Sequence, residues 1–280
     1  MSVLNAAARH GVPDIATDVL RVLKLSGIGL KEYHFAALIE AFCRNNQLKE
    51  ALITLHIMRS NNIQPLPGTS VSILDSIKDV ESLDSAWAII DEIHKAKSGL
   101  AIDALKVIIQ ASVLLRDLQR AVGFYKSLCD YGVEPDVTIF NILLDGCIAA
   151  QHRQFGDVLL DDIKKLKVRP NKETYEKIIL LCLTQEVYED AFFYLEEMKA
   201  AEFVPPQTVY EALVHKCRSM GDTRVDIALE EMRECGYKMS KPTSNQKKST
   251  SSTKVLEMTV GLDEGDKEYI KTGGLSRELS

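Results

Sequence analysis

Cysteine and histidine are the residue types in this chain that could bind a metal ion or supply a nucleophile. No two of the six cysteines form a C-x-x-C pair, so the sequence predicts neither a zinc site nor a redox motif. Three of them, Cys147, Cys182 and Cys217, lie 35 residues apart, which favours one repeated position for a small buried apolar side chain. The six histidines have no metal-ligand spacing, and we interpret them as surface or junction residues. No metal or other cofactor is predicted.

Neighbouring carboxylates could support general acid–base or metal chemistry, and such pairs recur along the chain. They are Asp91-Glu92, Asp161-Asp162, Glu196-Glu197 and Glu230-Glu231. Each pair comes just before a large apolar residue of a helical pattern, so we interpret it as the solvated outer surface of a helix. The chain also lacks a Gly-rich phosphate loop, a G-x-S-x-G segment and an H-E-x-x-H segment. The sequence therefore predicts a protein that is not an enzyme.

A period of 35 residues runs through the chain and would position these side chains. One position of the period is always small: Ala16, Ala51, Ala86, Ala121, Gly156 and Ala191. Seven residues later follows a large apolar residue: Leu23, Met58, Ile93, Leu128, Ile163 and Met198. A third position is bulky at all steps but one: Phe35, Ser70, Leu105, Phe140, Tyr175 and Tyr210. Because residues seven apart share a helix face, the pattern predicts buried faces on which neighbouring helices cross closely.

Four of the periods end in a loop with proline, as at residues 133–136 and 168–171, where Asp or Asn can cap the next helix. The predicted fold is all-α, an α-solenoid of antiparallel helix-turn-helix repeats wound into a right-handed superhelix. We place the repeats at residues 1–31 (partial), 32–66, 67–101, 102–136, 137–171, 172–206 and 207–241 (irregular). Residues 242–280, rich in Ser and Thr, are predicted to be a disordered tail.

Residues 1–241 resemble the pentatricopeptide repeat family. The segment EPDVTIFNILLDGC, from Glu134 to Cys147, resembles the family's repeat junction, and EDAFFYLEEMKAAEFVPP, from Glu189 to Pro206, resembles its second helix and loop. The resemblance implies binding of single-stranded RNA, with one base read per repeat along the first helices. It further implies a mitochondrial protein of the fungal type, in the group of small-subunit ribosomal RNA processing factors. The N-terminus itself shows no readable transit peptide.

The resemblance also assigns candidate base-reading residues, since in that family the fifth and last residues of a repeat select the base. Asn141 and Asn171 match a pair that the family uses for a pyrimidine, with cytosine preferred. Lys106 and Asp136 are a half-match. The corresponding pairs of the other repeats mostly lack the polar amide or hydroxyl that a base edge needs.

The charge of the chain limits how strongly it would hold RNA. Lys and Arg number 34 against 40 Asp and Glu, and the formal net charge is −6. The resemblance implies that the first helices form a concave binding face, whose basic residues are Lys78, Lys106, His215 and Arg218. These residues are too few for strong phosphate-driven affinity, so we expect weak or shared RNA binding. Two hypotheses stay open. The first is a non-catalytic RNA-binding factor in mitochondrial RNA processing, rRNA maturation or translation. The second is a scaffold that binds proteins during assembly of the mitochondrial ribosome or a respiratory complex.

Two expectations concern the surroundings of the chain. No apolar run approaches the roughly 18 residues that a membrane-spanning helix needs, so no membrane span is predicted. The period extrapolates to a position before Met1, so we expect further repeats in the full-length protein. Val3 and Leu4 should then be exposed, because an upstream repeat would cover them.

Overall fold

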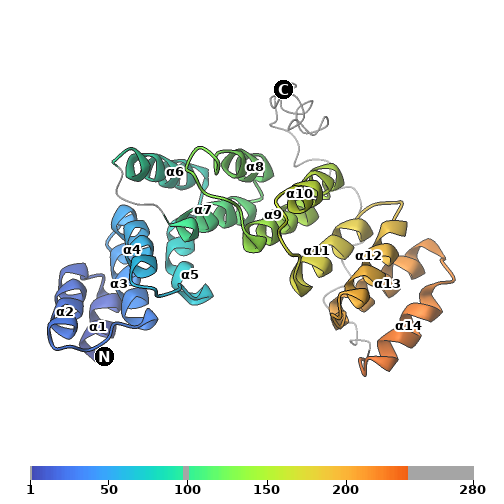
Figure 1. Ribbon diagram of the computed structural model, residues 1–280, viewed down its shortest axis with the longest axis horizontal. Coiled ribbons are helices and arrows are strands. Elements are labelled where there is room, and N and C mark those ends of the chain that lie inside the picture. The colour runs from blue at the N-terminus through green and yellow to red at the C-terminus, as the bar shows by residue number, and fades with distance from the viewer. Residues whose placement is uncertain (1, 97–100, 239–280) are drawn as a thin grey trace. The chain divides into compact units, whose positions relative to one another are not determined.

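The computed structural model describes residues 2–96 and 101–238, and every regular element within them is a helix (Figure 1). The helices are α1 (Ser2–His10), α2 (Pro13–Leu25), α3 (Glu32–Arg44), α4 (Leu48–Ser60), α5 (Pro67–Ser76), α6 (Val80–Lys95), α7 (Ile102–Leu114), α8 (Leu118–Lys126), α9 (Val137–Ala150), α10 (Arg153–Lys165), α11 (Lys172–Leu183), α12 (Glu189–Ala200), α13 (Gln207–Met220) and α14 (Val225–Glu234). The all-α fold built from helix-turn-helix pairs is confirmed.

The chain divides into two compact units, Met1–Gly146 (unit 1) and Cys147–Ser280 (unit 2), and the boundary falls inside α9. The assignment of residues 1–241 to one repeat array stays a prediction. The predicted tail, residues 242–280, lies outside the described residues.

The first helix of each pair recurs at a constant interval. From α3 onward these helices begin 35 residues apart, at Glu32, Pro67, Ile102, Val137, Lys172 and Gln207. The second helices are less regular, since α6 begins at Val80, only 32 residues after the start of α4 at Leu48. The local cause is the N-cap of α6, where the Asp79 carboxylate accepts a hydrogen bond from the Ser82 N–H at 2.8 Å and starts the helix early.

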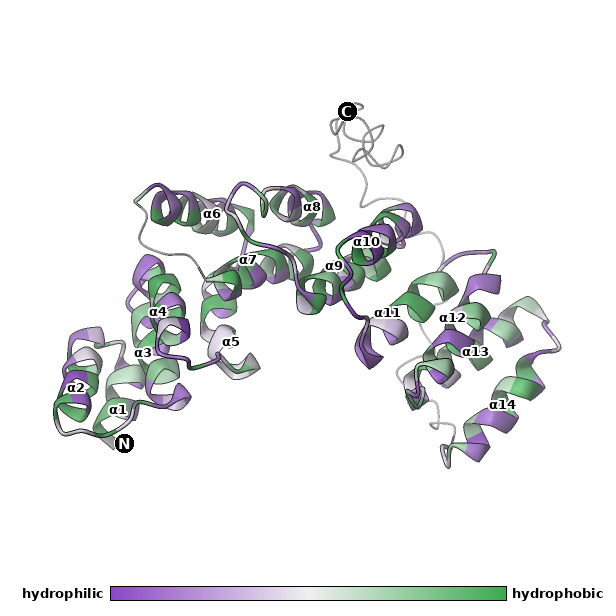
Figure 2. Cartoon of the chain, in the orientation of Figure 1, coloured by the Kyte–Doolittle hydropathy of each residue, from purple (hydrophilic) through white to green (hydrophobic). Residues whose placement is uncertain are grey.

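The core of unit 1 lies where helices cross at the small residues. Ala16, Ala51, Ala86 and Ala121 are fully buried, as are the large apolar residues Met58, Ile93 and Leu128 of the same faces. A methyl group at the crossing lets the neighbouring helix approach closely, and the larger residue two turns later fills the space beside it. Figure 2 shows the resulting alternation of hydrophobic and hydrophilic faces along each helix.

Unit 2 repeats this packing with one glycine. Gly156 on α10 faces α11 so closely that a Cβ atom there would lie 2.2 Å from Cδ2 of Leu181. Ala191 on α12 is fully buried, and the cysteines Cys147, Cys182 and Cys217 are buried too. The interpretation of the three cysteines as small buried core residues therefore agrees with the structure.

Several helices end through a residue in the left-handed region that is not glycine. Lys167 after α10 has φ +54°, and Glu202 after α12 has φ +62°. After α10 the Val168 N–H donates to the Ile163 carbonyl at 3.0 Å and the Lys167 N–H to the Lys164 carbonyl at 3.2 Å. Bonds of this kind close the last turn and fix the direction in which the loop leaves the helix.

The expectation for the first residues is half wrong. Val3 is 58% exposed, but Leu4 is completely buried. The physical reason is that α1 packs on α3 as well as on α2, so the covering surface comes from the following repeat.

Candidate nucleic-acid interface

Lys106 and Asp136, one pair of candidate base-reading residues, meet directly in unit 1. Lys106 projects from the first turns of α7, and its Nζ lies 2.6 Å from Oδ2 of Asp136, in the loop before α9. The other carboxylate oxygen of Asp136 accepts a hydrogen bond from the Ile139 N–H at 3.1 Å. Both charged groups therefore have a partner within the protein, and a base would have to compete with that ion pair.

A second ion pair continues from this site toward α4. Arg59, near the end of α4, donates two hydrogen bonds to Asp103 on α7, at 2.6 and 2.9 Å. Asp103 is 8% exposed, and its Oδ1 lies 4.0 Å from Nζ of Lys106. The hydrogen bonds to Asp103 raise the pKa of Arg59 above its usual value. The charge of Asp103, on the first helix of its pair, is thus neutralised by Arg59 and Lys106.

The other candidate pair is divided between the two units. Asn171 belongs to unit 2 and is the N-cap of α11, where its Oδ1 accepts from the Thr174 N–H at 2.9 Å and from the Thr174 hydroxyl at 2.8 Å. The Asn171 N–H donates in turn to the Thr174 hydroxyl oxygen at 3.2 Å, so the residue is held from both sides. Asn141 belongs to unit 1, on α9, and is only 2% exposed. Joint base reading by Asn141 and Asn171 stays a prediction.

Many acidic residues of the second helices take part in ion pairs between successive repeats. Arginines near the starts of second helices bind carboxylates of the neighbouring second helix at 2.7–3.0 Å: Arg120 to Asp84, Arg153 to Asp190 and Arg224 to Glu189. The hydrogen bonds from Arg224 lower the pKa of Glu189. The Arg224 guanidinium also lies over the Phe192 ring, 4.2 Å from its centroid. The acidity of the chain is therefore used partly to stack repeats.

Two histidines have structural roles that the sequence interpretation missed. Nδ1 of His34 accepts from the Lys31 N–H at 2.9 Å, and Nδ1 of His152 accepts from the Phe155 N–H at 3.1 Å at the start of α10. Burial lowers the pKa of both imidazoles, which favours the neutral form that can accept these bonds. For His152, its place directly before α10 was the available signal, because side chains at that position can cap the helix. His34 is the third residue of α3, where a side chain can bond back to the backbone N–H of the N-cap residue.

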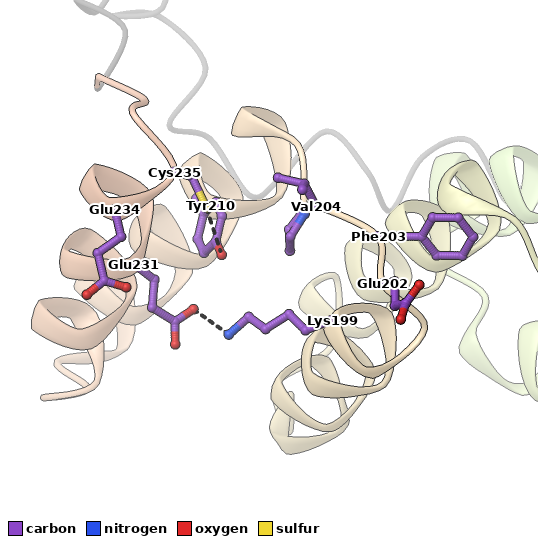
Figure 3. A pocket seen from close by; sticks show the side chains of 9 residues that line it. Lys199, Glu202, Phe203, Val204, Tyr210, Glu231, Glu234 and Cys235 are labelled. Carbon is purple, nitrogen blue, oxygen red and sulfur yellow. Dashed lines mark hydrogen bonds and ion pairs between the residues drawn. The ribbon is translucent and has the colours of Figure 1, made fainter.

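A pocket of about 450 Å³ lies between α12 and the last helix pair (Figure 3). Lys199 crosses one side of it, with Nζ 2.7 Å from Glu231 and 2.8 Å from Glu196. Tyr210 and Cys235 line another side, and the Cys235 Sγ lies 3.8 Å from the Tyr210 hydroxyl. The lining charges are already paired or face solvent, so we interpret the pocket as a junction between repeats. Among the residues described, no group of three or more His, Cys, Asp or Glu could hold a metal ion.

The helix pairs, their buried small residues and their polar junctions define the class of helical-repeat proteins. Two models of one family match the chain: that described as "Pentatricopeptide repeat-containing protein" over residues 1–128 and that described as "Pentatricopeptide repeat domain" over residues 113–187. The chain belongs to the pentatricopeptide repeat family.

Relatives of known sequence carry the same family name. A pentatricopeptide repeat-containing protein of Arabidopsis thaliana is 27% identical over 203 residues, 71% of this chain and 30% of that protein. A second, chloroplastic, Arabidopsis protein of the family is 27% identical over 62% of this chain and 21% of its own length. The chain thus spans less than a third of the length of each of these relatives. The matching relatives are plant proteins, so membership in a fungal-type group is not shown.

A solved structure agrees in fold. The pentatricopeptide repeat domain of Arabidopsis thaliana protein-only RNase P 1, in complex with tRNA, has a TM-score of 0.51 and 17% identity, covering 60% of this chain and 89% of that domain. The pentatricopeptide repeat protein PPR10 in complex with an 18-nucleotide RNA has a TM-score of 0.42 and 17% identity, covering 85% of this chain and 40% of that protein.

None of the helices described here is both long and apolar enough to cross a membrane.

Proposed function

We propose that this chain is a non-catalytic RNA-binding factor that binds single-stranded segments of an organellar transcript. The observation that carries the proposal is membership in the pentatricopeptide repeat family, together with polar side chains held rigidly at two repeat junctions. The comparison domain of protein-only RNase P 1, which has the same fold, was solved in complex with tRNA.

The junction residues would contact RNA through groups whose positions the protein has already fixed. Asp136 and Asn171 each cap the following first helix, so their side chains need no ordering when a ligand binds. The Lys106 ammonium group is paired with Asp136, and its side chain could rotate away from that carboxylate to contact a base or a phosphate of the RNA.

The cellular role and the subcellular location are inferred from the family resemblance. We infer a mitochondrial location and a role in processing or translation of a transcript, with maturation of the small-subunit ribosomal RNA as the specific case. Two of the relatives are named as chloroplastic proteins, so an import assay with isolated mitochondria and chloroplasts, using the full-length gene product, separates the two organelles.

Binding of labelled single-stranded RNA at increasing salt tests the function, because phosphate contacts make affinity fall with salt. The informative variant is Asn171→Asp, which keeps an oxygen for the Thr174 N–H and hence the helix cap, but replaces the amide donors. We expect preference for the base at one nucleotide to change by about fivefold or more, about 1 kcal/mol. A wild-type chain without salt-dependent RNA binding would contradict the proposal.

A protein-binding scaffold is the second candidate, because carboxylates on the first helices stay accessible. Asp75 and Glu173 are exposed, and such groups would favour a basic partner over RNA. If RNA affinity is negligible while a basic protein of the mitochondrial ribosome or of a respiratory-complex assembly pathway binds with an affinity that falls with salt, this second function is supported.

A further inference from the structure

One loop of unit 2 concentrates positive charge on this acidic chain. The loop joins α10 to α11. The cations in the loop and at the helix ends beside it, here called the basic junction, are Lys164, Lys165, Lys167, Arg169 and Lys172. All of them are exposed. Within the described residues only Lys165 has an ion-pair partner, Asp162 at 3.4 Å. In Figure 2 this loop and the start of α11 are mostly hydrophilic.

The equivalent loops of the neighbouring repeats have a different charge. One period earlier, residues 129–137 contain Asp130, Glu134 and Asp136 and no Lys or Arg. One period later, residues 199–207 contain a single Lys and a single Glu. Because the fold needs the same turn at each junction, the turn itself does not explain the positive charge at residues 164–172.

Helix electrostatics explain only two of the five cations of the basic junction. Lys164 and Lys165 lie in the last turn of α10, where cations interact favourably with the carbonyl end of the helix. Lys172 is the first residue of α11, at the amide end, where a cation is unfavourable. Arg169 lies between the two helices, and Lys167 occupies a left-handed position that glycine or asparagine would fill with less strain. Each of these three cations therefore either destabilises the junction or leaves its stability unchanged.

The backbone of the loop is fixed before any ligand arrives. Hydrogen bonds close the end of α10 around Lys167, Pro170 restricts the chain, and Asn171 caps α11. Residues 167–172 can span at most about 18 Å. Lys167, Arg169 and Lys172 therefore flank Asn171, the candidate base-reading residue, at short range on both sides.

We propose that Lys167, Arg169 and Lys172 bind the phosphates of single-stranded RNA on either side of the nucleotide presented to Asn171. This inference rests on the proposed RNA-binding function and assigns its main electrostatic contact. It reconciles RNA binding with the acidic composition, since local rather than net charge attracts the strand. An acidic protein surface would also be attracted, but the candidate base-reading residue Asn171 lies inside the basic junction, which favours RNA.

The test compares two triple variants of the full chain with the same change in net charge. K167Q/R169Q/K172Q removes the proposed contacts and leaves the last turn of α10 and the Asn171 cap unchanged. R9Q/K24Q/K31Q removes three exposed cations of unit 1 as the control. Affinity for a labelled pyrimidine-rich RNA and for a labelled purine-rich RNA is measured across a fourfold range of salt, and circular dichroism checks the helix content.

Three phosphate contacts on a single strand change the slope of log affinity against log salt by about 2. Over a fourfold rise in salt the wild type should therefore lose about 18-fold more affinity than K167Q/R169Q/K172Q, on both RNAs. The control should keep the wild-type slope. Equal slopes for the two variants would overturn this inference while the RNA-binding function stands. Absence of wild-type RNA binding would overturn both. Binding of an acidic peptide is measured as well. If K167Q/R169Q/K172Q loses affinity for that peptide but keeps the wild-type affinity for RNA, this inference is overturned in favour of a protein partner.

Discussion

Replacing Gly156 by alanine tests the close approach of α10 and α11. The new Cβ would lie 2.2 Å from Cδ2 of Leu181, whereas carbon atoms in contact are about 3.5–4.0 Å apart. The leucine methyl must therefore move by more than about 1 Å, although Leu181 is itself buried. Such overpacking costs about 1–3 kcal/mol, and the better helix propensity of alanine offsets about 1 kcal/mol of it. We expect the free energy of unfolding to fall by about 0–2 kcal/mol.

Gly123→Ala on α8 is the matched control, since Gly123 is exposed and no other side chain or backbone lies near its added Cβ. It should stabilise the chain by about 0.5–1 kcal/mol. Urea unfolding followed by circular dichroism gives the midpoint and slope for both variants. Leu181→Val should reduce the cost of Gly156→Ala, because the shorter side chain leaves room for the methyl. If Gly156→Ala stabilises as much as Gly123→Ala, the crossing is looser than the structure shows and the reasoning fails.

Two further predictions concern titratable groups. Burial lowers the pKa of His152 from its ordinary 6.5, so this residue contributes stability that is fully present above about pH 6.5 and is lost as pH falls below it. The variant His152→Asn keeps a cap for the Phe155 N–H without titrating, so its urea midpoint should fall less than that of the wild type on acidification, and parallel curves would contradict the assignment. Cys129 is exposed, whereas burial raises the pKa of Cys147 to about 12. A thiol reagent at mildly alkaline pH should modify Cys129 well before Cys147, as mass spectrometry of peptides would show, and equal rates would indicate local opening of α9.

The candidate site was only partly predictable from the sequence. The period places Lys106 and Asp136 at repeat positions 5 and last, and the structure joins them in an ion pair. Their mutual neutralisation could not be read from the sequence, because the partner of a charge depends on which rotamers converge across the junction. The same holds for Asp103, whose burial against Arg59 follows from packing between two repeats. The basic run at residues 164–172 was readable by aligning the junctions, but its exposure and lack of ion-pair partners required the structure.

The sequence alone determined the all-helical fold and the faces that are buried. Small residues spaced by 35 and large apolar residues seven positions later describe contacts between neighbours along the chain, and local periodicity contains that information. The tertiary structure alone decided which polar groups bind each other. It placed His34 and His152 as hydrogen-bond acceptors at helix starts and buried Leu4 against the following repeat. The physical reason is that a hydrogen bond or ion pair forms only within a narrow range of distances and angles between groups from different helices, whereas the burial of most apolar residues follows from the helix face that they occupy.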